Sequence, residues 1–442
     1  MLQRSPFYYL INLLIVGSGG REHALGWKLS QSKDIKRIYF APGNAGTCQN
    51  VKIQALEINR LKAFAQQNDC FTIVGPECPL ANGIVDSFLE DELGIFGPTK
   101  QASLLESSKI FAKKFMYENA IPTPRFKTFS DAEKAKDYVA REKCDLVVKA
   151  DGLASGKGVV VCNDHAQAID AIDGILLKKQ YGVAGDRILI EEKISGEECS
   201  FIVICDGKTI IPLSSSQDHK RIFDGDKGPN TGGMGSYSPT PLMDQELYDS
   251  IMSRIMLPVI EGMRKKANPF KGFLYAGIMV EQNTKKPYAL EFNVRMGDPE
   301  CQSILMRMES DLFEYIDSAS HEKLDSVSPI EWKNKFAVCV VMASKGYPET
   351  YEQGHPINGL NYNFGNDVKI FHSGTQIDTN NLIVTGGGRV LGVTALGYTV
   401  RNAIDNAYSA VRRISWGRND YHYRKDIANR YSNVDKQACF FL

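Results

Sequence analysis

The most informative segment of this chain reads Leu290-Glu291-Phe292-Asn293-Val294-Arg295-Met296-Gly297-Asp298-Pro299-Glu300. Its composition predicts a β-strand over residues 287–294. Glu291 and Asn293 would then project from one face, and Leu290 and Phe292 would face the core. The alternative is an edge strand with a solvated polar face.

The polar face of this strand suggests a metal site. A carboxylate beside an amide oxygen suits a hard cation such as Mg²⁺, which usually keeps waters and substrate phosphates as further ligands. Arg295 would lie on the same face if the strand continues, where a guanidinium can hold a carboxylate or phosphate. We therefore predict a phosphate-linked cation at Glu291 and Asn293.

Composition limits the class of protein. The 442 residues suffice for about three domains. The 52 Lys and Arg residues balance the 52 Asp and Glu residues, so we expect a small-molecule ligand and neither nucleic acid nor an anionic membrane as partner. Ten cysteines without a C-x-x-C pair indicate free thiols in a reducing cytosol, and we expect a cytoplasmic protein. The apolar residues 7–16 are interrupted by Asn12, too short for a bilayer span, and are expected to lead into the first strand.

Residues 10–16 predict a buried strand that ends at Gly17-Ser18-Gly19-Gly20-Arg21-Glu22-His23, with a helix after it. This layout directs backbone N–H groups and a helix N-terminus at an anion. A dinucleotide fingerprint is not met, because Glu22 occupies the position of its third glycine and the next strand ends in Ala41-Pro42-Gly43-Asn44 without an acid. Tight packing alone is the alternative.

A third strand, residues 71–74, ends in Gly75-Pro76-Glu77. Three strands with polar turns at their carboxyl ends predict an open α/β sheet with a ligand crevice along that edge. Residues 100–119 predict one helix containing Ser108 and Lys109. The prolines of Ile121-Pro122-Thr123-Pro124 then mark a linker into a new unit.

Strands over residues 145–149 and 159–162 flank the loop Ala150-Asp151-Gly152-Leu153-Ala154-Ser155-Gly156-Lys157-Gly158. Three glycines and a lysine indicate a mobile flap that closes over phosphates, with Lys149 and Lys157 supplying charge. It is not a Walker loop, because Gly158 stands where Ser or Thr would hold the metal. A long hairpin turn is the alternative.

A strand over residues 187–191 leads to Glu192-Lys193-Ile194, and Gly196-Glu197-Glu198 opens the next strand. Such a hinge can read an adenine edge, with an acid a few residues later for the ribose, although solvated carboxylates on a turn are the alternative. After Trp332 the pattern predicts a small α+β domain. Its glycine run before Arg389 favours a hairpin over a ligand contact.

Seven motifs occur in a characteristic order: Gly17-Ser-Gly-Gly-Arg-Glu-His, Pro42-Gly-Asn, Gly75-Pro-Glu, Lys149-Ala-Asp-Gly, Gln217-Asp-His-Lys-Arg, Gly232-Gly-Met-Gly and Glu291-Phe-Asn-Val-Arg with Gly297-Asp-Pro-Glu. From about Leu13 to near Arg430, the chain resembles the phosphoribosylamine–glycine ligase family of the ATP-grasp superfamily. The resemblance implies ATP-dependent ligation of glycine to 5-phosphoribosylamine through glycyl phosphate. The products would be glycinamide ribonucleotide, ADP and phosphate, in de novo purine biosynthesis with Mg²⁺ or Mn²⁺.

The resemblance also implies a multidomain α/β and α+β architecture. We expect an N-terminal open parallel α/β substrate domain at residues 11–106, an ATP-grasp domain at 107–335 with a mobile lid at about 123–193, and a small C-terminal α+β domain at 336–442. A monomer or a weak homodimer is expected.

Site roles follow from the same resemblance. ATP is expected at Lys109, Lys149, Asp151, Gly152, Ser155, Gly156, Lys157, Gly158, Glu191, Glu192, Ile194 and Glu198. Phosphoribosylamine is expected at Gly17, Gly19, Gly20, Arg21, Asn44, Glu77, Gly232, Gly233, Met234 and Gly235. The metal is expected to bind Glu291 and Asn293, and catalytic contacts around glycine are expected from Asp218, Lys220 and Arg295.

Two positions depart from the family pattern. Met296 stands where Phe is usual, a change between apolar residues. A second metal carboxylate is common on the preceding strand, but that position is Met279 here, with Glu281 as a weak substitute.

Two other functions stay open. Another ATP-grasp ligase would use a different acid or amine. A non-catalytic nucleotide sensor or a dinucleotide oxidoreductase would bind its nucleotide, for example NAD, without ATP turnover.

Overall fold

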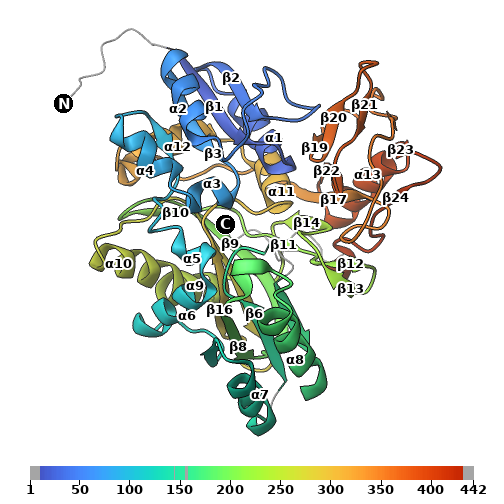
Figure 1. Cartoon of the computed structure of the whole chain (residues 1–442). Helices are drawn as coiled ribbons and strands as arrows, with labels where there is room; N and C mark the ends of the chain where they lie inside the picture. The colour runs from blue at the N-terminus through green and yellow to red at the C-terminus, as the bar shows by residue number, and fades with distance from the viewer. Residues whose placement is uncertain (1–9, 144, 155–157, 432–442) are drawn as a thin grey trace.

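The computed structural model describes residues 10–143, 145–154 and 158–431 (Figure 1). Ser155, Gly156 and Lys157, three of the predicted phosphate-binding residues, lie outside the described residues. In Figure 1 the N-terminal sheet lies at the top, the predicted lid at the bottom and the last strands of the chain at the right.

The N-terminal sheet is parallel, with strand order β2-β1-β3-β4. Its elements are β1 (Ile11–Gly17), α1 (Gly20–Leu29), β2 (Ile35–Pro42), α2 (Ile58–Gln67), β3 (Cys70–Val74), α3 (Glu77–Ala81), α4 (Ile84–Glu90) and β4 (Ile95–Phe96). Alternate residues of β1 are buried on opposite faces: Leu14 packs with α2 and α4, and Leu13 packs with α1. A parallel strand covered on both faces needs a continuous apolar run, so the predicted open α/β sheet is confirmed.

The predicted single helix over residues 100–119 is wrong, because the chain is extended at Ser108 and forms two helices, α5 (Leu104–Ser107) and α6 (Lys109–Glu118). The Ser108 hydroxyl accepts a hydrogen bond from the Phe111 N–H at 3.1 Å and caps α6. Lys109 consequently begins a helix instead of lying inside one.

The lid region contains an antiparallel sheet with order β5-β8-β6-β7. Its elements are β5 (Phe126–Phe129), α7 (Ala132–Arg141), β6 (Leu146–Ala150), β7 (Val159–Cys162), α8 (His165–Ile172) and β8 (Ile188–Glu192). Val139 of α7 and Ile172 of α8 pack on Val148 and Ile190, so the two helices cover one face of this sheet.

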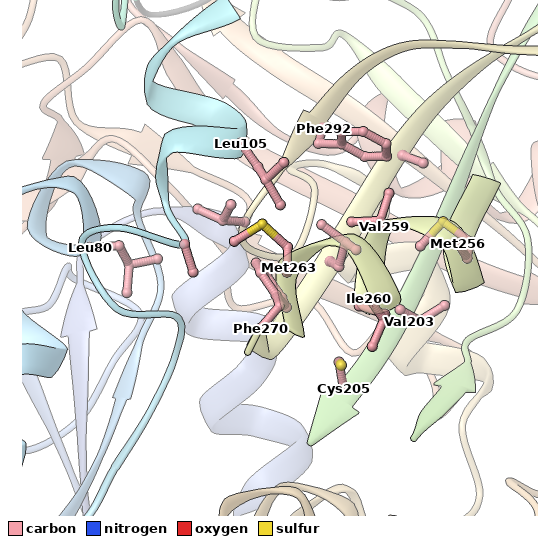
Figure 2. Packing of buried hydrophobic residues seen from close by; sticks show 14 of the residues in the cluster. Leu80, Leu105, Val203, Cys205, Met256, Val259, Ile260, Met263, Phe270 and Phe292 are labelled. Atoms are coloured by element: carbon pink, nitrogen blue, oxygen red, sulfur yellow. The ribbon is translucent and has the colours of Figure 1, made fainter. Parts of the chain in front are cut away.

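A second antiparallel sheet, β10-β9-β15-β16, carries the segment with which the sequence analysis began. Its strands are β9 (Gly196–Asp206), β10 (Ile210–Pro212), β15 (Lys271–Glu281) and β16 (Pro287–Asn293). Helices α9 (Gln245–Ile251) and α10 (Leu257–Lys265) flank a π-helical turn over Met252–Met256. Met256, Val259, Ile260 and Met263 pack with Val203 and Phe292 of the sheet (Figure 2).

The predicted orientation of the β16 side chains is confirmed in part. Phe292 is buried, while Glu291 and Asn293 line a cavity. Leu290 was expected in the core but also lines the cavity, because the pairing with β15 moves from Glu291 opposite Gly277 to Ala289 opposite Ile278 and leaves Leu290 as an extra residue. The strand ends at Asn293, so Arg295 lies beyond it.

The third large sheet has the order β11-β14-β17-β22-β19, with β24 beside β17. Its strands are β11 (Gln217–Asp218), β14 (Gly235–Ser238), β17 (Phe336–Ser344), β19 (Val368–His372), β22 (Arg389–Gly397) and β24 (Tyr421–His422). Helix α13 (Val400–Val411) packs on β17 and β22, and α11 (Glu300–Arg307) and α12 (Leu312–Ser320) connect β16 to β17. Asp218 and Gly235 therefore share a sheet with strands more than a hundred residues later.

Shorter strands complete the described chain: β12 (Arg221–Phe223) with β13 (Lys227–Asn230), β18 (Ile357–Asn358) with β23 (Ser415–Trp416), and β20 (Thr375–Ile377) with β21 (Ile383–Thr385). The cysteines that the structure describes have free thiols, as predicted, and all but Cys48 and Cys78 are buried. Within the described ranges, every helix is too short or too polar to cross a bilayer.

Candidate active site

A cavity of about 760 Å³ is lined by residues of the lid sheet, of the sheet that contains β16 and of the third large sheet, and by Arg21 of α1 and Glu77 of α3 in the N-terminal domain. Many of the predicted site residues line it: Arg21, Glu77, Lys109, Lys149, Gly152, Gly158, Glu198, Asp218, Lys220, Gly232, Glu291, Asn293 and Arg295. Residues predicted from distant motifs thus meet around one space.

Other predicted site residues are not among the lining residues: Gly17, Gly19, Gly20, Asn44, Asp151, Glu191, Glu192, Ile194, Gly233, Met234 and Gly235. For several of them the structure shows another partner. The Asn44 amide donates to the carbonyl oxygens of Ser18 and His372, both at 2.8 Å, and joins the glycine turn to β19. Met234 is buried.

Glu291 forms a loose ion pair. The Nζ of Lys109 lies 3.4 Å from its Oε2, and the two side chains are 21% and 29% exposed. Burial favours the neutral acid, but Lys109, Lys220 and Lys149 outweigh it and hold the pKa of Glu291 well below its usual range. The carboxylate is therefore ionised and faces the cavity.

Arg295 is clamped between two acids. It lies 3.0 Å from Glu77 and 2.8 Å from Glu106, and it donates to Asn293 Oδ1 at 3.2 Å. Burial disfavours ionisation of Glu77, but Arg295 and Arg21 outweigh it and lower the Glu77 pKa to about 2. Burial dominates at Glu106 and raises its pKa to about 7. The clamp holds the Asn293 side chain through the guanidinium.

Lys149 belongs to a buried cluster of three charged side chains, together with Lys113 and Glu191. Glu191 pairs with Lys149 through Oε1 and with Lys113 through Oε2, the latter at 2.7 Å. The Lys113 and Glu191 side chains are each 2% exposed. Burial lowers the Lys113 pKa to about 8, although Glu191 opposes this shift. The Glu191 carboxylate therefore orients Lys149 from behind instead of facing the cavity.

Asp151 attaches the first residues of the predicted flap to the N-terminus of α6. Its Oδ1 accepts hydrogen bonds from the Ser108 hydroxyl and the Ile110 N–H, both at 2.8 Å, and its Oδ2 pairs with Arg187 at 2.6 Å. These contacts tie the strand end at β6 to the N-terminus of α6, next to Lys109. Asp151 thus has a structural role in the described contacts.

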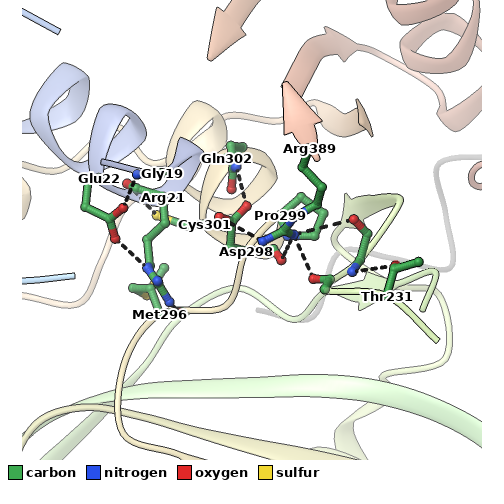
Figure 3. A network of polar contacts seen from close by, with 12 residues as sticks. Gly19, Arg21, Glu22, Thr231, Met296, Asp298, Pro299, Cys301, Gln302 and Arg389 are labelled. Carbon is green, nitrogen blue, oxygen red and sulfur yellow. Dashed lines mark hydrogen bonds and ion pairs between the residues drawn. The ribbon is translucent and has the colours of Figure 1, made fainter. Parts of the chain in front are cut away.

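The glycine turn after β1 is filled by its own acid. Glu22 accepts a hydrogen bond from the Gly19 N–H at 2.5 Å and pairs with Arg21 at 2.8 Å (Figure 3). A Cβ at Gly75 would lie 2.0 Å from Glu22 Oε1, so this glycine leaves room for the carboxylate. Because an anionic side chain occupies the turn, it does not offer a dinucleotide pyrophosphate site. Arg21, held by the Met296 carbonyl at 2.9 Å, lines the cavity instead.

The part of the cavity wall that contains Glu198 of β9 and Asp218 of β11 carries more acidic than basic side chains. Lys220 pairs with Glu198 at 2.5 Å. Burial raises the Asp218 pKa to about 8 against the effect of Lys220, with nearby Glu300 adding to the rise. None of the described residues donates a hydrogen bond or an ion pair to the Asp218 carboxylate. This wall is suited to receive a cation.

Sequence reasoning missed several lining residues. Arg389 donates to the carbonyls of Gly232 at 2.7 Å and Asp298 at 2.6 Å (Figure 3), and Glu106 holds Arg295. The only signal for Arg389 was the glycine run before it. Glu281, the suggested weak substitute for a second metal carboxylate, is half-buried, is not among the lining residues, and accepts hydrogen bonds from the Asn283 and Thr284 N–H groups of its own turn.

The donor set fits a cation that shares its coordination with a nucleotide. Among the described residues, no three His, Cys, Asp or Glu side chains gather as a metal site. Glu291 and Asn293 nevertheless line the cavity, the first as an ionised carboxylate and the second with an amide oxygen that also accepts a hydrogen bond from Arg295. Two protein oxygens completed by phosphates and water are typical of Mg²⁺.

Comparisons with known proteins cover almost the whole chain. Family models described as phosphoribosylglycinamide synthetase match in three parts: the N domain at residues 11–106, the ATP-grasp (A) domain at 107–301 and the C domain at 337–430. A phosphoribosylamine–glycine ligase of Neisseria meningitidis serogroup B is 47% identical over 96% of this chain and 100% of its own length.

Solved structures agree. The phosphoribosylamine–glycine ligase of Thermotoga maritima has a TM-score of 0.82 at 32% identity and covers 95% of this chain and 100% of its own. The biotin carboxylase domain of a Hydrogenobacter thermophilus 2-oxoglutarate carboxylase, solved with MgADP, has a TM-score of 0.69 at 14% identity, covers 93% of this chain and 91% of its own, and shares the fold alone. The chain therefore belongs to the phosphoribosylamine–glycine ligase family, with an ATP-grasp fold.

Proposed function

We propose that this cavity ligates glycine to 5-phosphoribosylamine at the expense of ATP, giving glycinamide ribonucleotide, ADP and phosphate in de novo purine biosynthesis. The observation that carries the proposal is the continuity of the cavity. Lys109, Lys149 and Glu291 line one part, and Arg21, Glu77 and Gly232 line another. A nucleotide and a sugar phosphate can therefore meet in one space.

ATP is assigned to the part between the lid sheet and β16. Lys109 and Lys149 supply charge for its phosphates, and Gly152 and Gly158 let the flap backbone approach them. Val161, Met279 and Leu290 offer apolar surface for adenine. The Oε1 of Glu198 is left for a ribose hydroxyl, because Oε2 binds Lys220.

The flap residues 155–157 and the hinge residues Glu191, Glu192 and Ile194 are proposed for ATP on the family pattern. For the hinge this role falls to the backbone, since the Glu191 carboxylate is enclosed by Lys113 and Lys149. The lid over residues 123–193 would close on the nucleotide and exclude water from labile species.

Mg²⁺ or Mn²⁺ would be held by Glu291 and Asn293. When bound, the ion would offset charge on the phosphates and the transferring phosphoryl group. Lys109 then has a second function, because its pairing with Glu291 at 3.4 Å can be exchanged for a phosphate contact as the acid takes up its ligand.

Glycine is assigned to the acid-rich wall. Its ammonium group suits the Asp218 carboxylate, which forms no hydrogen bond or ion pair with a described residue, and its carboxylate would lie toward Arg295 and Lys220. Phosphoribosylamine is assigned to the Arg21, Glu77 and Gly232 end, with Gly17, Gly19, Gly20, Asn44 and 233–235 shaping that end from behind.

The chemistry needs positioning more than a protein nucleophile. A glycine carboxylate oxygen attacks the γ-phosphorus of ATP, and ADP leaves, giving glycyl phosphate. The amine of phosphoribosylamine then attacks the carbonyl carbon, and phosphate leaves as the amide forms. Lysine and arginine side chains would stabilise charge in both steps, so no Ser–His or Cys–His pair is required.

Omission assays test this function. Phosphate release should need ATP, glycine and phosphoribosylamine together, and glycinamide ribonucleotide should form in equal amount. Phosphate release with another acid or amine, but not with these, would contradict the proposal. We also propose that the protein is cytoplasmic. We further propose a monomer or weak homodimer, and sedimentation of the purified chain tests this oligomeric state.

A further inference from the structure

Residues 422–431 lie against the β12–β13 hairpin (Figure 1). Arg221, Asp226 and Asn230 of this hairpin line the cavity. Within the described chain the two hairpin strands pair only with each other. A two-stranded hairpin is marginally stable alone, so its position depends on contacts from other segments.

Arg424 supplies the main contact. Its side chain is 0% exposed and lies 2.7 Å from Asp226 Oδ1 at the hairpin turn. It also donates to the Arg221 carbonyl at 3.1 Å and makes a bidentate pair with Asp426. Asp426 in turn accepts a hydrogen bond from the Gly225 N–H at 2.8 Å. A buried guanidinium thus joins β12 and the turn of the hairpin.

Neighbouring residues repeat this attachment. The Lys425 N–H donates to Asp224 at 2.8 Å, and the His422 Nε2 lies 2.8 Å from the Ile222 carbonyl oxygen. At the other end of the segment, Arg430 pairs with Glu197 at 2.8 Å at the start of β9. The 422–431 segment therefore spans from the hairpin to the strand that carries Glu198.

The hairpin lies between two groups assigned to substrates. Asp218 and Lys220 precede it, and Gly232 follows it. The Thr231 N–H donates to the Lys220 carbonyl at 2.8 Å, so the two ends of the hairpin are joined at the cavity wall. A displacement of the hairpin would move both groups together.

We propose that Arg424, acting through Asp226, is a positioning residue that holds residues 219–231 against the cavity. Arg424, which is not among the residues that line the cavity, then sets the glycine and phosphoribosylamine end of the site without touching substrate. The expected kinetic effect rests on the proposed function. The ATP groups Lys109 and Lys149 come from other elements and should be affected least.

Asp226→Asn tests this inference, because it removes the charge of a side chain that is 52% exposed and leaves the Arg424–Asp426 pair intact. Asp405→Asn is the matched control, since it removes one acid from the exposed Arg401–Asp405 pair on α13. Hydrogen exchange without substrates should be about tenfold faster at residues 221–231 in Asp226→Asn, and unchanged in the control.

Steady-state kinetics give the second measurement. The KM values for glycine and phosphoribosylamine should rise about three- to tenfold in Asp226→Asn, while the KM for ATP changes by less than about twofold. Unchanged exchange at 221–231, or equal acceleration in β1 and β17, would overturn the positioning role. Equal increases in all three KM values would do the same. Because exchange is measured without substrates, it decides the inference even if the wild-type chain fails the omission assay.

Discussion

Two glutamates pair with lysines near the proposed ATP site, and their surroundings differ. Glu191 lies between Lys113 and Lys149, and its side chain is 2% exposed. Glu291 has Lys109 at 3.4 Å and is 29% exposed. Lysines lower the pKa of both acids against the effect of burial. A perturbed pKa alone therefore does not distinguish a structural acid from a ligand-binding one. The exposure of the carboxylate and its distance from the paired lysine do distinguish Glu291 from Glu191.

The largest effect is expected for Glu291→Gln. Loss of the charged oxygen should lower kcat by about 10³-fold, because charge on the transferring phosphoryl group is no longer offset. The melting temperature should stay close to wild type, since the Glu291–Lys109 pair is loose. Steady-state turnover and thermal unfolding check both points, and near-normal turnover would refute the metal assignment.

Glu191→Gln should act on stability instead. The change leaves Lys113 and Lys149 buried without a counter-charge, and the free energy of unfolding should fall by about 3–5 kcal/mol. Urea unfolding measures this, with Glu291→Gln as the matched control. Full stability combined with lost ATP binding would show that Glu191 contacts the nucleotide directly and would remove the contrast between the two sites.

Asp218 extends the comparison to an acid that forms no ion pair with a described residue. Its pKa is raised to about 8, so the carboxyl is neutral below that pH and ionised above it. Because the ionised form is needed to hold an ammonium group, kcat/KM for glycine should rise with pH up to about 8. Asp218→Asn should lose about tenfold at the alkaline end and flatten this profile. A wild-type profile without a rise would contradict the ammonium role.

The smallest effect is expected at an exposed pair on the lid. Lys179 and Asp186 lie 2.8 Å apart with side chains 49% and 58% exposed. Asp186→Asn should change the free energy of unfolding by less than about 1 kcal/mol and leave turnover unchanged. A larger loss of stability would mean that exposure does not rank these pairs, which would weaken the comparison of Glu191 with Glu291.

Local patterns allowed part of this site to be predicted. The two-residue period of a strand placed Glu291 and Asn293 on one face, the apolar run of β1 predicted a buried strand, and three strands that end in polar turns predicted an open α/β sheet. The prediction that Leu290 faces the core was wrong, because the extra residue in β16 depends on the pairing of this strand with β15. Likewise, the helix break at Ser108 depends on one hydroxyl that caps the next turn.

Contacts between distant segments could not be predicted in this way. Nothing near Glu191 in sequence shows that Lys113 encloses its carboxylate, and nothing near Arg389 shows that it reaches Asp298. Glu106 is similar, because its role depends on Arg295, which lies far along the chain. These residues share burial and long-range charge pairing, which a single sequence does not display.

Anomalous diffraction from crystals grown with Mn²⁺ and an ATP analogue tests the central claim most directly. The account predicts an anomalous peak bound by the Glu291 carboxylate and the Asn293 amide oxygen, next to the nucleotide phosphates. A nucleotide-bound peak elsewhere, with both oxygens unliganded, would contradict it.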